Sequence, residues 1–256
     1  MRITSSGITD IGRRRDRNED TFLIHDELQL FVVADGMGGH AGGEYASSLA
    51  VNVVEELVSS VELPHERPDV DGDGDADPVD VLRGLVEEAV QTAGQRIHDW
   101  GQDHPEFRGM GTTVVVLLMH GGNAYIGHVG DSRAYMLRDG QIDQATDDHS
   151  LVAQSVREGL ITEEQARTHR MRNVITRALG FHREVEVEVQ VRATRRGDVF
   201  LLCTDGLSGP VQAHDMRDLL MRHGPQEAAR QLVGLANARG GDDNITCVVV
   251  RVDEVA

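Results

Sequence analysis

Two apolar runs that each end in an Asp-Gly step constrain this chain more than any other feature. Residues 31–36 end in Asp35 and Gly36, and residues 199–206 end in Asp205 and Gly206. Runs rich in Val, Leu and Phe favour buried strands, whose ends are held rigidly. We therefore expect both carboxylates at the rim of a sheet, where each glycine lets the backbone turn sharply past them.

Two further acidic residues lie at similar boundaries. Asp131 follows the apolar run 125–129, and Asp243 precedes the apolar run 245–250. Clustered carboxylates repel one another unless a cation neutralises them, and their oxygens are the usual ligands of hard metal ions. Carboxylates at all of these strand boundaries therefore predict a site for a hard metal ion.

The order of patterns along the chain predicts an α+β layered sandwich. Apolar residues keep helical spacing over 43–60 and 78–101, and two short helices are expected within 215–238. Strand patterns occupy most other regions, namely two strands within 20–35, then 112–119, 123–129, 134–138, 185–191 and 245–252. Asp139 and Gly140 form a hairpin signal between strands. Because the helices come in two blocks among antiparallel-looking strands, we expect them on the outer faces.

Charge and composition exclude several classes of function. The net charge is −18, which argues against a nucleic-acid binder because such a protein needs a basic face. All 25 basic residues are Arg, so there is no lysine for a phosphate-binding loop, a kinase site or a Schiff base. The length of 256 residues gives ample core for an enzyme.

The cysteines and the start of the chain predict a protein of the cytoplasm. Cys203 and Cys247 lie in apolar runs, which favours buried thiols over a disulfide or a metal site. The first residues carry no signal-peptide pattern, and no apolar run approaches the about 18 residues that a membrane span needs. We therefore expect a soluble, cytoplasmic protein without a membrane span.

Six short motifs follow one another along the chain. They are Arg15 with residues 18–20, then residues 34–40, 111–113, 130–133, 204–207 and 243–246. Each is weak alone, because a lone Asp-Gly usually marks only a turn. Together and in this order they resemble the motifs of the metal-dependent Ser/Thr protein phosphatases, the type 2C or PPM family, in its bacterial branch. The resemblance covers roughly residues 7–252.

The resemblance implies a fold and a division of the chain. The expected fold is a four-layer α-β-β-α sandwich, in which two mostly antiparallel sheets are flanked by helical pairs. Residues 1–256 would form a single phosphatase catalytic domain. Within it, residues 61–78 would be an acidic linker loop, and residues 150–172 a flap beside the active site.

The resemblance also implies a ligand set for two Mn²⁺ or Mg²⁺ ions and for a third ion found in many bacterial members. Asp35 would bridge the first two ions, and Asp205 and Asp243 would complete one site. The carbonyl of Gly36, with Glu19 acting through water, would serve the other site. Asp131 together with Asp205 would match the third site.

The chemistry of these residue types agrees with that expectation. Oxygen-only ligands suit Mg²⁺ or Mn²⁺ rather than Zn²⁺. Two ions would activate a bridging hydroxide that attacks phosphorus directly, and Arg15 would hold the phosphoryl oxygens. The expected function is hydrolysis of phosphoserine and phosphothreonine in proteins, opposing bacterial Ser/Thr kinases, by a monomer whose partners are those kinases and their substrates.

Several assignments keep an alternative. Arg15 lies in the basic run 13–17, whose ordinary role is a solvated surface, and Asp20 could orient the metal ligands through hydrogen bonds. Met37 stands where animal members carry the histidine proposed to protonate the leaving group, and a thioether donates no proton. His40 is the candidate acid instead, with a metal-bound water as the alternative donor.

Other acidic and histidine motifs have structural interpretations. Residues 69–80 resemble a calcium loop, but an acidic linker is favoured, with Asp77 as a helix cap and Pro78 as the first helical residue. His128 and His149 are expected to be packed, hydrogen-bonded residues.

Two rival functions remain. One is a non-catalytic family member that binds phosphoproteins. The presence of residues able to bind metal at all matching positions argues against it. The other is an aspartyl-phosphate enzyme with Asp205 as nucleophile. Such enzymes usually need a lysine, and the absence of lysine from this chain argues against it.

Overall fold

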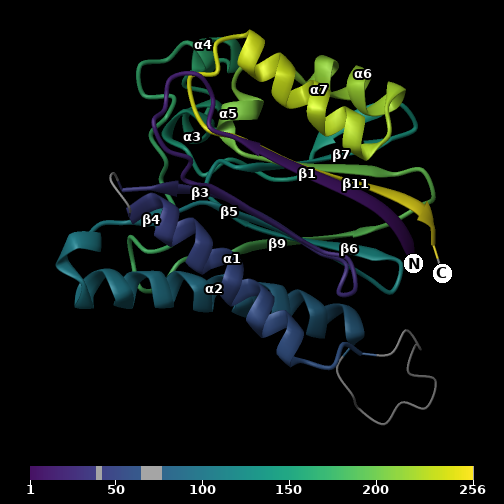
Figure 1. Cartoon of the computed structure of the whole chain (residues 1–256), viewed down its shortest axis with the longest axis horizontal. Coiled ribbons are helices and arrows are strands. Elements are labelled where there is room, and N and C mark those ends of the chain that lie inside the picture. The colour runs from purple at the N-terminus through teal and green to yellow at the C-terminus, as the bar shows by residue number, and fades with distance from the viewer. Residues whose placement is uncertain (39–41, 65–76, 256) are drawn as a thin grey trace.

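The computed structural model describes residues 1–38, 42–64 and 77–255. Two β-sheets face each other in the middle of the molecule (Figure 1). The five-stranded sheet has, in order, β1 (Arg2–Asp10), β11 (Ile245–Glu254), β10 (Val199–Cys203), β7 (Arg133–Arg138) and β8 (Gln141–Gln144). The six-stranded sheet has β2 (Asp20–His25), β3 (Leu30–Met37), β5 (Val114–His120), β6 (Asn123–Val129) and β9 (Glu188–Ala193), with β4 (Gly111–Thr112) beside β3. These strands all pair antiparallel.

A pair of long helices covers each outer face. Helices α1 (Gly42–Ser60) and α2 (Pro78–Asp103) pack on the six-stranded sheet, and α6 (Ala213–Arg222) and α7 (Pro225–Ala238) on the other. Three apolar clusters separate the layers, and the one between the sheets holds Phe31, Phe200 and Val248. The expected four-layer α-β-β-α sandwich is therefore confirmed.

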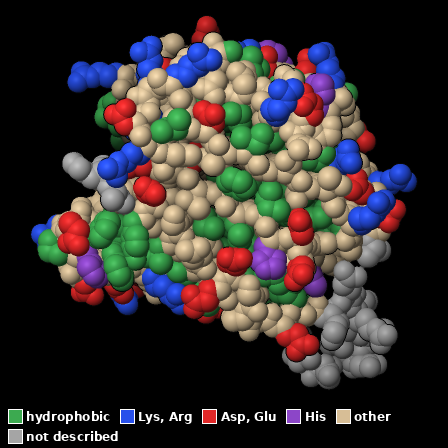
Figure 2. All heavy atoms as spheres, viewed as in Figure 1, with side chains coloured by type: hydrophobic (Ala, Val, Ile, Leu, Met, Phe, Trp, Pro, Cys, Tyr) green, Lys and Arg blue, Asp and Glu red, His purple; other side chains and the backbone are tan. Residues whose placement is uncertain are grey.

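The α1–α2 pair carries a stack of aromatic rings. The ring centroids of Tyr45 and Trp100 lie 5.1 Å apart, and those of Trp100 and His104 lie 3.9 Å apart. Figure 2 shows hydrophobic side chains gathered on the surface at this end of α2. At the other end of α2, the side chain of Asp77 accepts a hydrogen bond from the backbone N–H of Val79, and Pro78 opens the helix. The expected cap is thus confirmed.

The strands differ from expectation in three places. Strand β1 has no counterpart in the sequence analysis, because its residues are mostly polar and it lies at a sheet edge with one face partly exposed. Strand β3 continues through Asp35 to Met37, since β4 pairs with its last residues. Strand β9 begins only at Glu188, although the alternating pattern starts at Val185.

The short helices gather at one end of the sandwich, and both chain termini lie at the opposite end (Figure 1). These helices are α3 (Leu151–Arg157), α4 (Glu163–Arg167) and α5 (Asp205–Ser208), and a 3-10 turn, η1, covers Pro105–Phe107. The Asp139–Gly140 hairpin joins β7 to β8, with φ values of 52° and 77° as a two-residue turn requires.

Cys203 and Cys247 are both buried free thiols, as predicted. Among the described residues, no helix combines the length and apolar character required to cross a bilayer. His40 and most of the run 69–80 lie outside the described residues.

Candidate active site

Asp35 lies inside β3, directly opposite Asp20 on β2. Its backbone is fixed by two threonines. The carbonyl oxygen of Asp35 accepts bonds from the Thr113 N–H at 2.9 Å and the Thr112 hydroxyl at 2.8 Å. The hydroxyl of Thr113 also lies 2.7 Å from that of Ser132, which follows Asp131. The motif at 111–113 therefore joins Asp35 to the Asp131 loop.

The two Asp-Gly steps need glycine for close packing, not for a positive φ. A Cβ atom on Gly36 would lie 2.1 Å from the carbonyl oxygen of Gly43, where α1 begins. A Cβ atom on Gly206 would lie 1.9 Å from the carbonyl oxygen of Asn244. Real Cβ atoms do not approach backbone so closely, and neither glycine has a positive φ. The sharp turn expected after Asp35 is wrong, because β3 continues to Met37; at Asp205 the chain does turn, from β10 into α5, but without a positive φ at Gly206.

Asn244 organises the segment that carries Glu19. Its side-chain N–H groups donate to the carbonyl oxygens of Ile11 and Arg17 at 3.0 and 2.8 Å. Its side-chain oxygen accepts from the backbone N–H of Glu19 at 2.9 Å. The residue beside Asp243 thus fixes the loop before β2, so Asp243 and Glu19 are held in one unit.

The carboxylates interact electrostatically as one cluster. Burial raises the pKa of Asp35 well above its usual range, and Asp20, Asp205, Asp131 and Asp243 raise it further. Burial and then Asp205 raise the pKa of Asp131 to about 7. Burial and then Asp243 raise the pKa of Asp205. Groups with so much mutual repulsion call for a cation or protons among them.

Asp20 carries an unsatisfied oxygen. One carboxylate oxygen accepts from the Thr204 hydroxyl at 3.0 Å, while the other, Oδ1, is buried without a hydrogen-bond partner. Burial raises the pKa of Asp20 to about 7. A buried polar atom without a partner is costly, so this oxygen adds to the demand for positive charge at the cluster.

Arg15 is the residue of the basic run that reaches the cluster. Its Nη2 lies 2.6 Å from Oδ2 of Asp243, and that hydrogen bond raises the pKa of Arg15. Arg14 instead approaches the exposed Asp242 at 3.8 Å. Burial raises the pKa of Glu19, against the lowering effect of the nearby Arg15. Half of the Arg15 side chain remains exposed, so its other N–H groups are open to a ligand.

The structure thus brings together all the predicted site residues that it describes: Arg15, Glu19, Asp35, Gly36, Asp131, Asp205 and Asp243. Thr112 and Thr113 hold the backbone of Asp35, and Thr204 holds the side chain of Asp20, roles that were not predicted from the sequence. Their only signal was their position inside the short motifs, beside the acidic residues.

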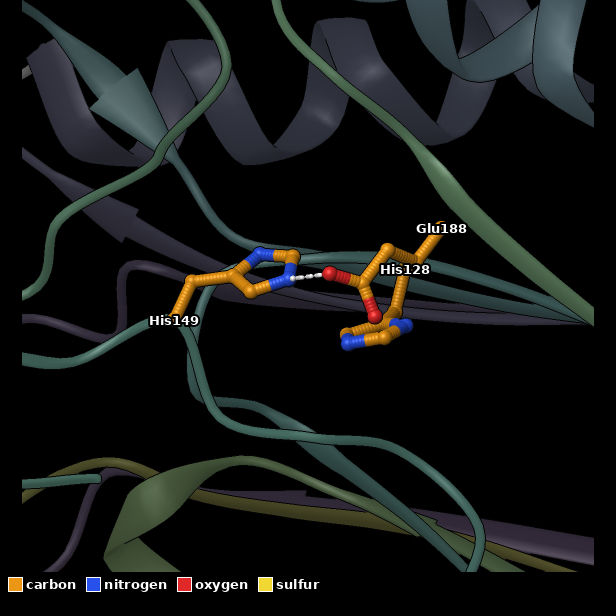
Figure 3. Close-up of side chains that lie close together, drawn as sticks. All are labelled: His128, His149 and Glu188. Atoms are coloured by element: carbon orange, nitrogen blue, oxygen red, sulfur yellow. Dashed lines mark hydrogen bonds and ion pairs between the residues drawn. The ribbon is translucent and has the colours of Figure 1, made fainter. Parts of the chain in front are cut away.

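His128, His149 and Glu188 form a second polar cluster (Figure 3). Ligand-type atoms of His128, His149 and Glu188 lie within 4.8 Å of one another. The two rings stack with centroids 4.7 Å apart, and His149 bonds to Glu188 at 2.9 Å. Both histidines are packed and hydrogen-bonded, as the sequence predicted, whereas Glu188 and the neighbouring Arg177 carried no sequence signal.

Comparisons with known proteins agree with this site. The chain is 38% identical to the serine/threonine protein phosphatase PstP of Mycobacterium tuberculosis over 244 residues, which is 95% of this chain but 44% of PstP. The chain therefore spans less than half the length of that curated relative. It is 34% identical to the serine/threonine phosphatase stp of Listeria monocytogenes over 249 residues, covering 96% of this chain and 94% of that protein.

Solved structures resemble the chain equally well. The crystal structure of the M. tuberculosis phosphatase PstP superposes with a TM-score of 0.86 at 37% identity, covering 98% of this chain and 99% of that one. The PstP catalytic domain in complex with two manganese ions gives a TM-score of 0.84 at 36% identity, with the same coverage of both chains. The family model described as protein phosphatase 2C matches residues 12–237. With its carboxylate cluster, four-layer fold and relatives in agreement, the chain belongs to the protein phosphatase 2C family.

Proposed function

We propose that the chain hydrolyses phosphoserine and phosphothreonine in proteins in a metal-dependent reaction. The observation that carries the proposal is the cluster of Asp20, Asp35, Asp131, Asp205 and Asp243, whose members raise one another's pKa at one end of the sandwich. The phosphatases named above supply the class of reaction, and the oxygen-rich cluster supplies a site for its metal ions.

The donor set fits Mn²⁺ or Mg²⁺. The cluster consists of carboxylate oxygens, among them the unpartnered Oδ1 of Asp20, and hard ions prefer such ligands. Asp35, Asp205 and Asp243 would hold two ions with Glu19 and the Gly36 carbonyl, and Asp131 would serve a third. When bound, such ions supply an activated hydroxide and neutralise charge on the phosphoryl group.

Arg15 would orient the substrate. Its guanidinium is anchored to Asp243 at 2.6 Å on one side and exposed on the other. A planar guanidinium matches two phosphoryl oxygens at once, so the free N–H groups would hold the phosphate in line for attack. The anchor also places Arg15 against a residue of the metal set, which fixes the phosphate relative to the ions.

The proton donor for the leaving alkoxide is a separate question. Met37 ends β3 beside the site and offers only a thioether. We propose His40 as the acid. His40→Ala should then slow hydrolysis of alkyl phosphates much more than that of p-nitrophenyl phosphate, whose leaving group needs no proton. Equal losses on both substrates would reject His40 and favour a metal-bound water.

The test of the proposed function is phosphate release from a phosphothreonine peptide with Mn²⁺. EDTA should abolish turnover, and Asp35→Asn or Asp205→Asn should reduce kcat/KM by at least about 100-fold, because each removes a charge that holds the ions. Asp143→Asn, on the exposed edge of β8, is the matched control and should keep full activity. Turnover that resists EDTA, or full activity in both site variants, would overturn the proposal.

We further propose that the partners of the chain are phosphorylated proteins, namely Ser/Thr kinases and their substrates. Residues 1–256 would form one catalytic domain, which would act as a monomer in the cytoplasm. The flap, residues 150–172, would lie at its active-site end, where α3 and α4 are found (Figure 1).

A further inference from the structure

The flap is fastened at its base to the loop that carries Asp131. The backbone N–H of His149 donates to the carbonyl oxygen of Gly130 at 2.9 Å. The carbonyl oxygen of His149 accepts from Thr176 at 2.7 Å, and Leu151 donates to Val174 at 2.9 Å. The segments at the two ends of the flap, 149–151 and 174–176, are thus joined to each other and to the residue before Asp131.

The side chain of His149 makes the same connection a second time. Its Nδ1 accepts from the buried backbone N–H of Gly130 at 3.1 Å. A backbone N–H only donates, so Nδ1 has no proton and the neutral ring carries its proton on Nε2. That Nε2–H donates to Glu188 on β9 at 2.9 Å (Figure 3). Burial and the stacked His128 lower the pKa of His149, which keeps the ring neutral.

Arg177, which follows the flap in the sequence, completes this network. Its Nη1 lies 3.1 Å from Oε1 of Glu188, and its Nη2 lies 2.8 Å from Glu186. The guanidinium therefore supplies the positive charge beside Glu188, and the proton on Nε2 of His149 occupies the position a metal would need. These two features favour a hydrogen-bonded joint over a metal site at His128, His149 and Glu188.

We propose that His149 is a positioning residue that couples the flap to the Asp131 loop. The inference rests on the proposed function only in taking Asp131 as a residue that responds to Mn²⁺. Because Nδ1 of His149 bonds to the N–H of Gly130, beside Asp131, ordering of that loop by a cation is transmitted to the flap, residues 150–172. Binding of a cation at Asp131 should therefore increase the order of the flap, and order in the flap should favour binding of the cation.

Hydrogen–deuterium exchange of the full chain, with and without Mn²⁺, tests this coupling directly. In the wild type, Mn²⁺ should slow exchange both at residues 130–132 and in the flap, residues 150–172. In His149→Ala it should still slow exchange at 130–132, whereas the effect on the flap should fall about fivefold or more, as expected for loss of a typical coupling free energy. Equal flap protection in both proteins, or none in the wild type, would overturn the inference.

A conservative variant separates positioning from mere packing. The side-chain oxygen of Asn at position 149 can replace Nδ1 as the acceptor for Gly130, so His149→Asn should restore most of the flap response. His214→Asn, at an exposed position of α6, is the control and should behave like the wild type. A flap response in His149→Asn as small as in His149→Ala would also contradict the proposal.

If His149→Ala is too unstable to measure, Glu188→Ala removes the acceptor that orients the ring from a partly exposed position. It should weaken the flap response while leaving the Gly130 bond available, and an unchanged response would count against the coupling. Failure of Mn²⁺ to alter exchange at 130–132 in the wild type would instead count against Asp131 as a metal residue, which distinguishes the two proposals.

Discussion

At the scale of single residues, the buried carboxylates of the site repel one another. Asp131 shows this most clearly, because burial and Asp205 raise its pKa to about 7. A folded-state pKa above that of the unfolded chain gives stability that is present at low pH and lost as pH rises through the folded value. The metal-free protein is therefore weakened by its own carboxylates at neutral and alkaline pH.

Asp131→Asn should stabilise the metal-free protein at pH 8. A rise in pKa from about 4 in the unfolded chain to about 7 in the fold corresponds to at most about 4 kcal/mol. We expect a gain of about 1–3 kcal/mol, seen as a higher Tm in EDTA. The gain should shrink at pH 5, where the folded carboxyl is already protonated.

The control for this prediction is Asp143→Asn, an exposed carboxylate on β8 whose loss should leave Tm unchanged. If Asp131→Asn has a Tm at or below that of the wild type at pH 8, the prediction is wrong. Repulsion at Asp131 would then not destabilise the metal-free protein.

At the scale of elements, the two Asp-Gly steps are places where backbones nearly touch. Gly206, in α5, lies against the carbonyl of Asn244 just before β11, and Gly36, in β3, lies against the first turn of α1. Since Asn244 also holds the loop with Glu19, the spacing of α5 from β11 controls the position of several site residues.

Gly206→Ala should cost about 3 kcal/mol of unfolding free energy, because a Cβ atom 1.9 Å from a backbone oxygen forces the backbone apart. Gly84→Ala is the matched control, since an added Cβ in that exposed turn of α2 meets nothing within 4 Å. It should gain up to about 1 kcal/mol through helix propensity. Urea unfolding measures both, and similar midpoints for the two variants would refute the close-packing argument.

Much of the fold and most of the acidic cluster could be predicted from the sequence. The long helices and the inner strands can be predicted because their apolar periodicity is strong. Strand β1 does not, because an edge strand with a polar face has no such pattern. The His149–Glu188–Arg177 network could not be foreseen either, since its members lie up to 39 positions apart in the sequence and meet only through β9 and the flap.

At the scale of the whole molecule, the carboxylate cluster lies where the two sheets meet. Asp20 and Asp35 belong to the six-stranded sheet, whereas Asp205 and Asp243 flank strands of the five-stranded sheet. Asp131 lies between β6 of one sheet and β7 of the other. Ions bound here would link both halves of the sandwich.

Mn²⁺ should therefore raise Tm of the whole chain, and the rise should be larger at pH 8 than at pH 6. At pH 6, protons already neutralise Asp20 and Asp131, whose pKa values are about 7, and compete with the ion. Saturation 100-fold above Kd gives about 2.7 kcal/mol for one site. Scanning calorimetry with Mn²⁺ and with EDTA measures the difference, and a rise independent of pH would contradict the electrostatic account.

The aromatic stack on α1 and α2 gives the molecule a native optical reporter. Trp100 is the one tryptophan in the chain, so all indole emission comes from a single position. It lies against Tyr45, only two residues after Gly43, whose backbone packs on Glu19 and Gly36. The emission of this fluorophore, whose ring also stacks on His104, should follow events in the first turn of α1. Ion loading at the carboxylates can thus be monitored by light, without dye, label or substrate.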